Sequence, residues 1–104
     1  MLFLGIDIGS SSVKLSVLDG QTGKSLGSLS HPESELAILS PEAGFAEQDP
    51  STWWDCVRQG FTRLVAKASF DPKAISAIGI SYQMHGLVMV DANQNVLRPS
   101  IIWC

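Results

Sequence analysis

Apolar and polar residues alternate along the first third of the chain with the period of two that is typical of β-strands. Residues 2–8 are apolar apart from Asp7, which predicts a central strand that is covered on both faces. Residues 13–18 alternate with a period of two and predict a second strand, and a weaker, serine-rich strand is predicted over residues 24–30. Glycine-containing turns separate the three segments, so an antiparallel meander is predicted.

A helical pattern follows a loop, predicted over residues 31–48, that has no clear period. Asp49 is a favourable N-cap and Pro50 suits the first helical position. Apolar residues then recur at three- and four-residue spacing, which predicts an amphipathic helix over residues 50–68. Its apolar face comprises Trp54, Val57, Phe61, Leu64, Val65 and Ala68. Its opposite face is predicted to be solvated and comprises Asp55, Arg58, Gln59, Arg63 and Lys67.

One further strand is predicted over residues 74–82, after the helix-breaking Asp71-Pro72 pair. Its composition predicts that it is buried. One face carries Ile78, Ile80 and Tyr82. The other carries the small residues Ala77, Gly79 and Ser81, which let a backbone or a ligand approach closely. Two short apolar runs around residues 91–95 predict a terminal hairpin. The predicted fold is therefore α/β, with the order βββαβ followed by a short hairpin.

Composition narrows the possible functions. The 104 residues carry 7 Lys and Arg against 10 Asp and Glu, a net charge of −3, and they form one domain at most. Such a chain lacks the clustered Lys and Arg residues that bind nucleic acid or anionic lipid. Its apolar first segment is too short for a membrane span or a signal peptide. Cys56 and Cys104 have no disulfide or zinc spacing, so a cytoplasmic location is expected. The apolar end of the chain predicts a truncated domain.

Asp7 is the first candidate for chemistry, because a carboxylate within a buried strand requires a partner. That partner is either a set of backbone amides, the nearby Lys14, or a magnesium-bound phosphate. The adjacent segment Gly9–Ser12 offers successive N–H and O–H donors that suit a phosphate, and Lys14 adds a cation. A plain serine-rich hairpin turn has the same composition. The P-loop and Rossmann patterns are both missing from the sequence, so a phosphate site would be of the strand-turn-strand type.

Gln83, Met84, His85 and Gly86 form the second candidate cluster, at the end of the last predicted strand. Ligands often bind at such strand ends in α/β folds. Met84 is equally suited to core packing and His85 to a structural role, and Trp103 either packs or lines a pocket. No second histidine stands close enough in sequence to make a metal pair.

These clusters together resemble the amino-terminal part of xylulokinases, in the FGGY carbohydrate kinase family. The matching stretches run from end to end of the chain: residues 5–14, residues 46–50 with Trp53-Trp54, residues 83–86, residues 97–99 and residues 101–103. The first stretch is shared by sugar kinases broadly, whereas Gln-Met-His-Gly and Glu-Gln-Asp-Pro point to xylulokinase.

The resemblance implies an incomplete ribonuclease H-like (actin-like ATPase) domain over residues 1–104. It implies that Asp7 lies near Mg2+ and the transferred phosphate, and that Gly9, Ser10, Ser11, Ser12 and Lys14 face ATP. Gln83, Met84, His85 and Trp103 are then expected to bind the sugar. The implied reaction converts D-xylulose and ATP into xylulose 5-phosphate and ADP.

In the family a second aspartate, well downstream, acts as the general base, so these 104 residues are expected to be inactive alone. Strand edges left open by truncation are expected to cause self-association. Two other functions remain open. One is another FGGY kinase acting on ribulose, gluconate or glycerol, and the other is a non-catalytic nucleotide-binding module.

Overall fold

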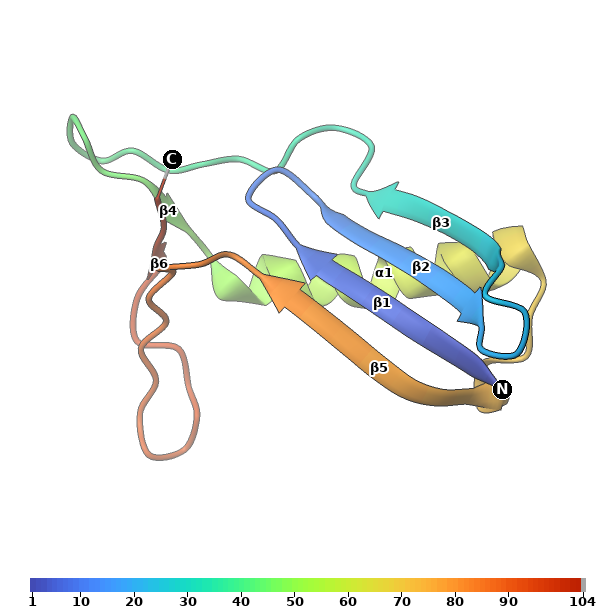
Figure 1. Cartoon of the computed structure of the whole chain (residues 1–104). Coiled ribbons are helices and arrows are strands. Elements are labelled where there is room, and N and C mark those ends of the chain that lie inside the picture. Colours follow the sequence, from blue (N-terminus) through green and yellow to red (C-terminus); the bar gives the residue numbers. More distant parts are fainter. Residues whose placement is uncertain (104) are drawn as a thin grey trace.

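In a computed structural model, which describes residues 1–103, one long helix packs on one face of a four-stranded sheet (Figure 1). The strands β1 (Leu2–Ile8), β2 (Val13–Asp19), β3 (Ser25–His31) and β5 (Ile75–Tyr82) are arranged in the order β3-β2-β1-β5. β1 pairs antiparallel with β2 and parallel with β5. The predicted antiparallel meander and the order βββαβ are both confirmed.

Local chemistry sets the limits of the helix α1 (Pro50–Ala68) where the sequence predicts them. The carboxylate of Asp49 accepts a hydrogen bond of 2.9 Å from the amide of Ser51, which satisfies one of the free N–H groups of the first turn. Ser69 ends the helix in the left-handed conformation, with φ of 53°. A short 3₁₀ turn, η1 (Pro72–Ala74), then leads into β5.

The core lies between α1 and the strands β1 and β2. Their facing side chains are almost fully buried: Leu4, Ile6, Val13, Leu15, Val17, Val57 and Leu64. The helix approaches closely at Gly60, where an added Cβ would lie 2.6 Å from Cδ1 of Leu15. Trp54 was predicted on the apolar face but is 62% exposed, and it does not belong to the core cluster.

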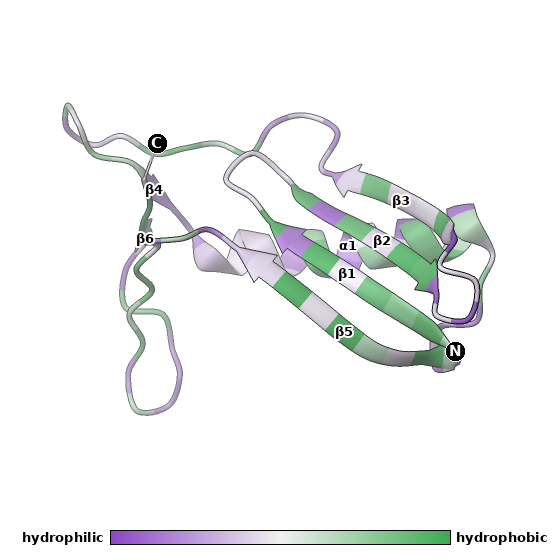
Figure 2. Ribbon diagram, viewed as in Figure 1, coloured by the Kyte–Doolittle hydropathy of each residue, from purple (hydrophilic) through white to green (hydrophobic). Residues whose placement is uncertain are grey.

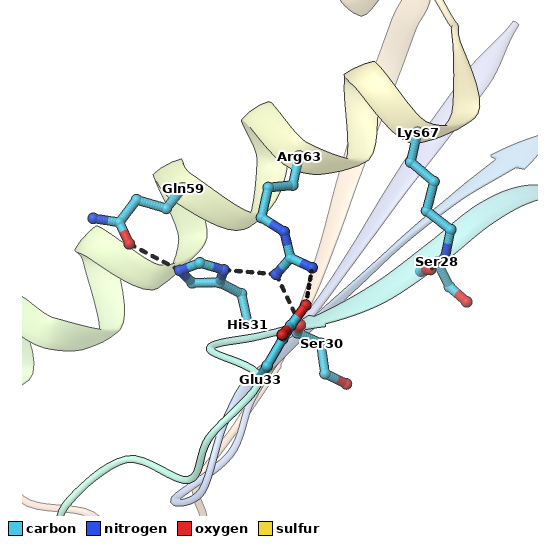
Figure 3. A network of polar contacts seen from close by, with 7 residues as sticks. All are labelled: Ser28, Ser30, His31, Glu33, Gln59, Arg63 and Lys67. Carbon is cyan, nitrogen blue, oxygen red and sulfur yellow. Dashed lines mark hydrogen bonds and ion pairs between the residues drawn. The ribbon is translucent and has the colours of Figure 1, made fainter.

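The polar side of α1 is not simply solvated, which corrects the prediction, because part of it binds β3 (Figure 3). Arg63 donates to Nδ1 of His31 at 2.8 Å, so the ring proton is on Nε2 and is donated to Oε1 of Gln59, also at 2.8 Å. Arg63 also pairs with Glu33 at 3.2 Å, and Lys67 donates to a backbone carbonyl of β3 at 2.8 Å. These contacts fasten the helix to an outer strand.

A second, two-stranded sheet lies beyond the end of the main sheet (Figure 1). It pairs β4 (Glu47–Gln48) with β6 (Ser100–Ile101), and neither strand was predicted from the sequence. The predicted terminal hairpin is present, and an isolated β-bridge between Val90 and Val96 joins its two arms. Because these segments extend past the core, the radius of gyration is 15.5 Å, against about 13 Å for a compact domain of this size.

Coverage of the main sheet differs from the sequence prediction in two respects. β1 is central but is covered on one face, where α1 packs, while Asp7 on the other face is exposed. β5 was predicted to be buried, yet Ile78, Ile80 and Tyr82 are 58%, 60% and 75% exposed. Figure 2 shows green, apolar bands along β5, which is an edge strand of the sheet. The part of the chain that the structure describes supplies no further layer over them.

Candidate functional site

Both candidate clusters lie at the same edge of the sheet, because β1 and β5 run parallel and end side by side. The segment Gly9–Ser12, called here the serine turn, leaves the end of β1. The segment Gln83–Gly86, called the QMHG segment, leaves the end of β5. Figure 1 shows both strands pointing toward the small β4–β6 sheet. The topology thus brings together residues that are more than 70 positions apart in the sequence.

Asp7 lies on the open face of the sheet, beside the serine turn, and its carboxylate is exposed. The hydroxyl of Ser81 on β5 donates to Oδ1 of Asp7 at 2.9 Å. Lys14 stands opposite Asp7 in the strand register, but the ion pairs found within residues 1–103 involve neither side chain. The expectation of a buried carboxylate is therefore wrong, and within residues 1–103 neither Lys14 nor a backbone amide is its partner. Asp7 instead presents a free oxygen to solvent.

A shallow hollow of about 610 Å³ lies over this open face. Asp7 and Lys14 supply the charges, and the rest of its polar lining is made of serine hydroxyls and glycine backbone: Gly5, Ser16, Ser28, Ser30, Gly79 and Ser81. The small side chains leave room above the backbone, as the sequence of β5 indicated. A bulky polar ligand can therefore reach the carboxylate of Asp7.

In the serine turn, the carbonyls of Ser10–Ser12 are occupied and the donors of the same three residues are free, while the amide of Gly9 is used within the turn. The carbonyl of Ser10 accepts from the side chain of Gln48, that of Ser11 from the amide of Leu36 at 2.8 Å, and that of Ser12 from Gly9 at 3.0 Å. Within residues 1–103 no hydrogen bond uses the amides or hydroxyls of Ser10, Ser11 or Ser12 as donors. A turn whose carbonyls are bound and whose N–H and O–H groups are free is suited to an anion such as phosphate.

The QMHG segment is brought to the end of the described chain by hydrogen bonds between Leu87 and Ile101, of 2.9 and 3.1 Å. As a result the rings of His85 and Trp103 meet edge to face, with centroids 5.6 Å apart. His85 adopts a left-handed backbone with φ of 64°, an uncommon conformation that turns the segment sharply. Met84 is 56% exposed, so it does not fill the core. Exposed His85 and Trp103 form a surface that suits the hydroxyls and apolar faces of a small polar ligand.

Two residues that the sequence analysis left without a role belong to this site. Ser81 holds the carboxylate of Asp7, and Gln48 contacts the serine turn and the QMHG segment at once. Only the small size of Ser81 was visible in the sequence pattern. Gln48 belongs to the Glu-Gln-Asp-Pro stretch that carries the resemblance, but the sequence analysis assigned it no role, because its partners are distant in sequence.

A metal ion at this site would have to share its ligands with the bound substrate. Residues 1–103 contain no group of three or more His, Cys, Asp or Glu side chains placed to hold a metal. Mg2+, however, is commonly held by one or two carboxylates together with phosphate oxygens and water. The free oxygen of Asp7, next to a turn whose free donors suit an anion, fits that arrangement. No helix within residues 1–103 is long and apolar enough to cross a membrane.

Comparison with known proteins places this geometry in context. Residues 2–104 match the N-terminal domain of the FGGY family of carbohydrate kinases. The xylulose kinase of Staphylococcus epidermidis is 37% identical over 100 residues, which cover 96% of this chain and 19% of that protein.

Two solved structures share the fold. The xylulose kinase of Brucella ovis superposes with a TM-score of 0.89 at 37% identity, over 99% of this chain and 21% of its own. The gluconate kinase of Lactobacillus acidophilus gives 0.81 at 30% identity, over 96% of this chain and 19% of its own. The chain thus spans about a fifth of the length of the proteins it matches. These neighbours confirm the predicted incomplete kinase domain.

Proposed function

Because the chain belongs to the FGGY family of carbohydrate kinases, we propose that the longer protein containing it phosphorylates D-xylulose with ATP, giving xylulose 5-phosphate and ADP. We take residues 1–104 as the first part of its N-terminal domain. A cytoplasmic location belongs to the proposal and is supported by the free thiol of Cys56.

One observation carries the proposal: the serine turn, with its donors free, lies at the same sheet edge as the QMHG segment. In the proposed complex the amides and hydroxyls of Ser10, Ser11 and Ser12 bind the phosphates of ATP. Lys14, on the same face as Asp7, adds a positive charge near them. Phosphoryl transfer depends mainly on positioning and charge neutralisation, which is the work these groups can do.

Asp7 is the residue that would hold Mg2+, and Ser81 keeps its carboxylate oriented toward the open face. When bound, the ion neutralises charge on the transferred phosphate. The sugar is proposed to lie against His85 and Trp103, with Gln83 and Met84 beside it. The same ring contact fixes the orientation of the imidazole toward the sugar hydroxyls.

The general base is expected in the part of the longer protein that follows this chain, as in the kinases it resembles. We therefore expect the 104 residues alone to be inactive. Detection of ATP-dependent xylulose phosphorylation by the purified chain would contradict this part of the proposal.

The test is a substrate panel on the full-length protein. ADP release is measured with D-xylulose, ribulose, gluconate and glycerol, in the native protein and in His85→Ala. We expect D-xylulose to give the highest kcat/KM and His85→Ala to lower it by at least about tenfold. Unchanged xylulose turnover in His85→Ala would remove the sugar-binding role of this residue.

A second candidate is a kinase for gluconate, which the likeness to a gluconate kinase at 30% identity favours. A higher kcat/KM for gluconate in the panel would select it. Binding of Mg-nucleotide without binding or turnover of any sugar would instead support a non-catalytic nucleotide-binding module.

A further inference from the structure

Gln48 lies where four separate segments of the chain meet. Its side chain is 2% exposed and is one of the largest fully buried ones in the part of the chain that the structure describes. Its backbone in β4 pairs with Ser100 in β6. Its amide group contacts the serine turn, the first turn of α1 and the QMHG segment. A buried polar side chain in this position joins the two halves of the candidate site.

The direction of each hydrogen bond follows from Trp53. An indole N–H can only donate, so its bond of 2.9 Å fixes the oxygen Oε1 of Gln48 on the side of α1. The amino group of Gln48 then faces two backbone carbonyls, those of Ser10 and Ala37, which can only accept. Every contact made by Gln48 agrees with this single orientation.

The same orientation determines how Gln83 is presented. Its Nε2 lies 3.4 Å from Oε1 of Gln48 and donates to it, because that oxygen is an acceptor. Its own oxygen Oε1 is buried and has no hydrogen-bond partner within residues 1–103. Buried carbonyl oxygens without partners are rare and unfavourable. Gln83 also lines a hollow of about 300 Å³, so a small movement of its side chain would bring this oxygen to a ligand hydroxyl.

We propose that Gln48 is a positioning residue for both substrates, holding the serine turn for the nucleotide and the acceptor oxygen of Gln83 for a hydroxyl of the sugar. The inference rests on the proposed function. Gln48 touches neither substrate and acts through the carbonyl of Ser10 on one side and through Gln83 on the other. Removing its amide should therefore affect two binding constants by two separable routes.

A double-mutant cycle on the full-length protein tests the sugar route. Gln48→Met keeps the volume of the side chain and removes its hydrogen bonds, and Gln83→Met removes the one partner on the sugar side. We expect Gln48→Met to raise KM for D-xylulose about tenfold in the native background and less than about twofold in the Gln83→Met background. An equal rise in both backgrounds would overturn the proposed route, because a general structural defect is indifferent to Gln83.

Calorimetric binding of MgADP tests the nucleotide route without any sugar. We expect Gln48→Met to raise Kd by about fivefold to tenfold whether or not Gln83 is present, because this route runs through Ser10. Gln21→Met is the matched control, since Gln21 is exposed and lies in the turn between β2 and β3, at the end of the sheet opposite the site. It should leave Kd unchanged. An unchanged Kd in Gln48→Met would overturn the inference.

Two further measurements keep the test decisive. If Gln48→Met does not fold, Trp53→Phe keeps an aromatic ring and removes the indole donor that orients Gln48, and the same two constants should rise by about threefold. No change in either would contradict the inference. If the native protein does not phosphorylate xylulose, the proposed function fails. The MgADP comparison of Gln48→Met with Gln21→Met still decides whether Gln48 positions the serine turn.

Discussion

The strands β2 and β5 of the main sheet carry the same apolar pattern, but the apolar side chains of β2 are buried and those of β5 are exposed. Val13, Leu15 and Val17 of β2 are 0%, 1% and 0% exposed. The register of β1 with its two neighbours places Ile78, Ile80 and Tyr82 of β5 on the same side of the sheet. Yet those three side chains stay more than half exposed.

The difference is made by α1, which packs over β2 and β3 and leaves β5 uncovered. Alternation along a strand therefore determines which side chains point the same way, but another element has to bury them. An apolar strand face this exposed is typical of a surface that is covered by a partner or by more of the same protein. The candidate site lies at the boundary between the covered and uncovered halves.

The largest expected difference between the two strands is in stability. Leu15→Ala removes a buried side chain and should lower the free energy of unfolding of the chain by about 2–5 kcal/mol. Ile80→Ala on β5 should lower it by less than about 1 kcal/mol, because Ile80 is 60% exposed. Urea denaturation at low protein concentration measures both. Equal losses would mean that β5 is buried in solution.

Asp7 extends the comparison to the open face of β1. In the full-length protein Asp7→Asn should lower kcat about a hundredfold or more, since it removes charge from the proposed phosphate site. In the isolated chain it should change stability by less than about 0.5 kcal/mol, because the exposed side chain has a single hydrogen bond, from Ser81. Steady-state kinetics and urea denaturation provide the two numbers. A large loss of stability would identify Asp7 as a structural residue.

Self-association of the isolated chain is the next expected effect. The free edge and apolar side of β5 offer an unpaired strand, so we propose that the 104 residues form dimers or larger species. Ile80→Lys should weaken this association about tenfold, whereas Ala77→Lys, at an exposed position on the opposite side of β5, should have little effect. Light scattering over a range of concentrations distinguishes the two. A strictly monomeric native chain at high concentration would contradict the proposal.

The smallest expected effect is a change of stability with pH that comes from Cys56, which lies in α1 on the covered side of the sheet. Burial, and secondly the charge of Asp55, raise the pKa of this thiol. The thiol therefore keeps its proton longer in the folded chain than in the unfolded chain. Its contribution to stability is complete below the unfolded value near pH 8.5 and is lost as the pH rises through the folded pKa.

Two measurements check this in a Cys104→Ser background. Alkylation of Cys56 by iodoacetamide at pH 8 should be at least about tenfold slower in the folded chain than in urea, because the thiolate is the reactive form. Above about pH 8.5 the urea concentration at the midpoint of unfolding should decrease slightly with rising pH. Cys56→Ala should remove this part of the decrease. Equal alkylation rates would mean that the thiol is not protected.

Local patterns predicted the parts of the fold that depend on neighbouring residues. Asp49 and Pro50 defined the start of α1 because capping acts within one turn, and alternation located β1, β2, β3 and β5 to within a residue or two. The exposure of β5 could not be predicted, because it depends on which element lies over it. The same holds for the polar side of α1, where Arg63 and Lys67 bind β3 instead of solvent.

The candidate site was predictable where one segment carries its own signal. The serine turn and the QMHG segment each stand out by residue type next to a strand end. Gln48 and Ser81 do not, because their importance comes from partners 35 and 74 positions away. The contact of His85 with Trp103 likewise depends on the pairing of Leu87 with Ile101, which alternation alone did not predict.

The central claim is that the serine turn and the QMHG segment form one site for a nucleotide and a sugar. A crystal structure of the full-length protein with MgADP and D-xylulose tests it most directly. The account predicts phosphate oxygens within hydrogen-bond distance of the amides of Ser10–Ser12, Mg2+ on the side of Asp7, and the sugar against His85 and Trp103. Phosphates bound away from the serine turn, or a sugar that contacts neither ring, would contradict it.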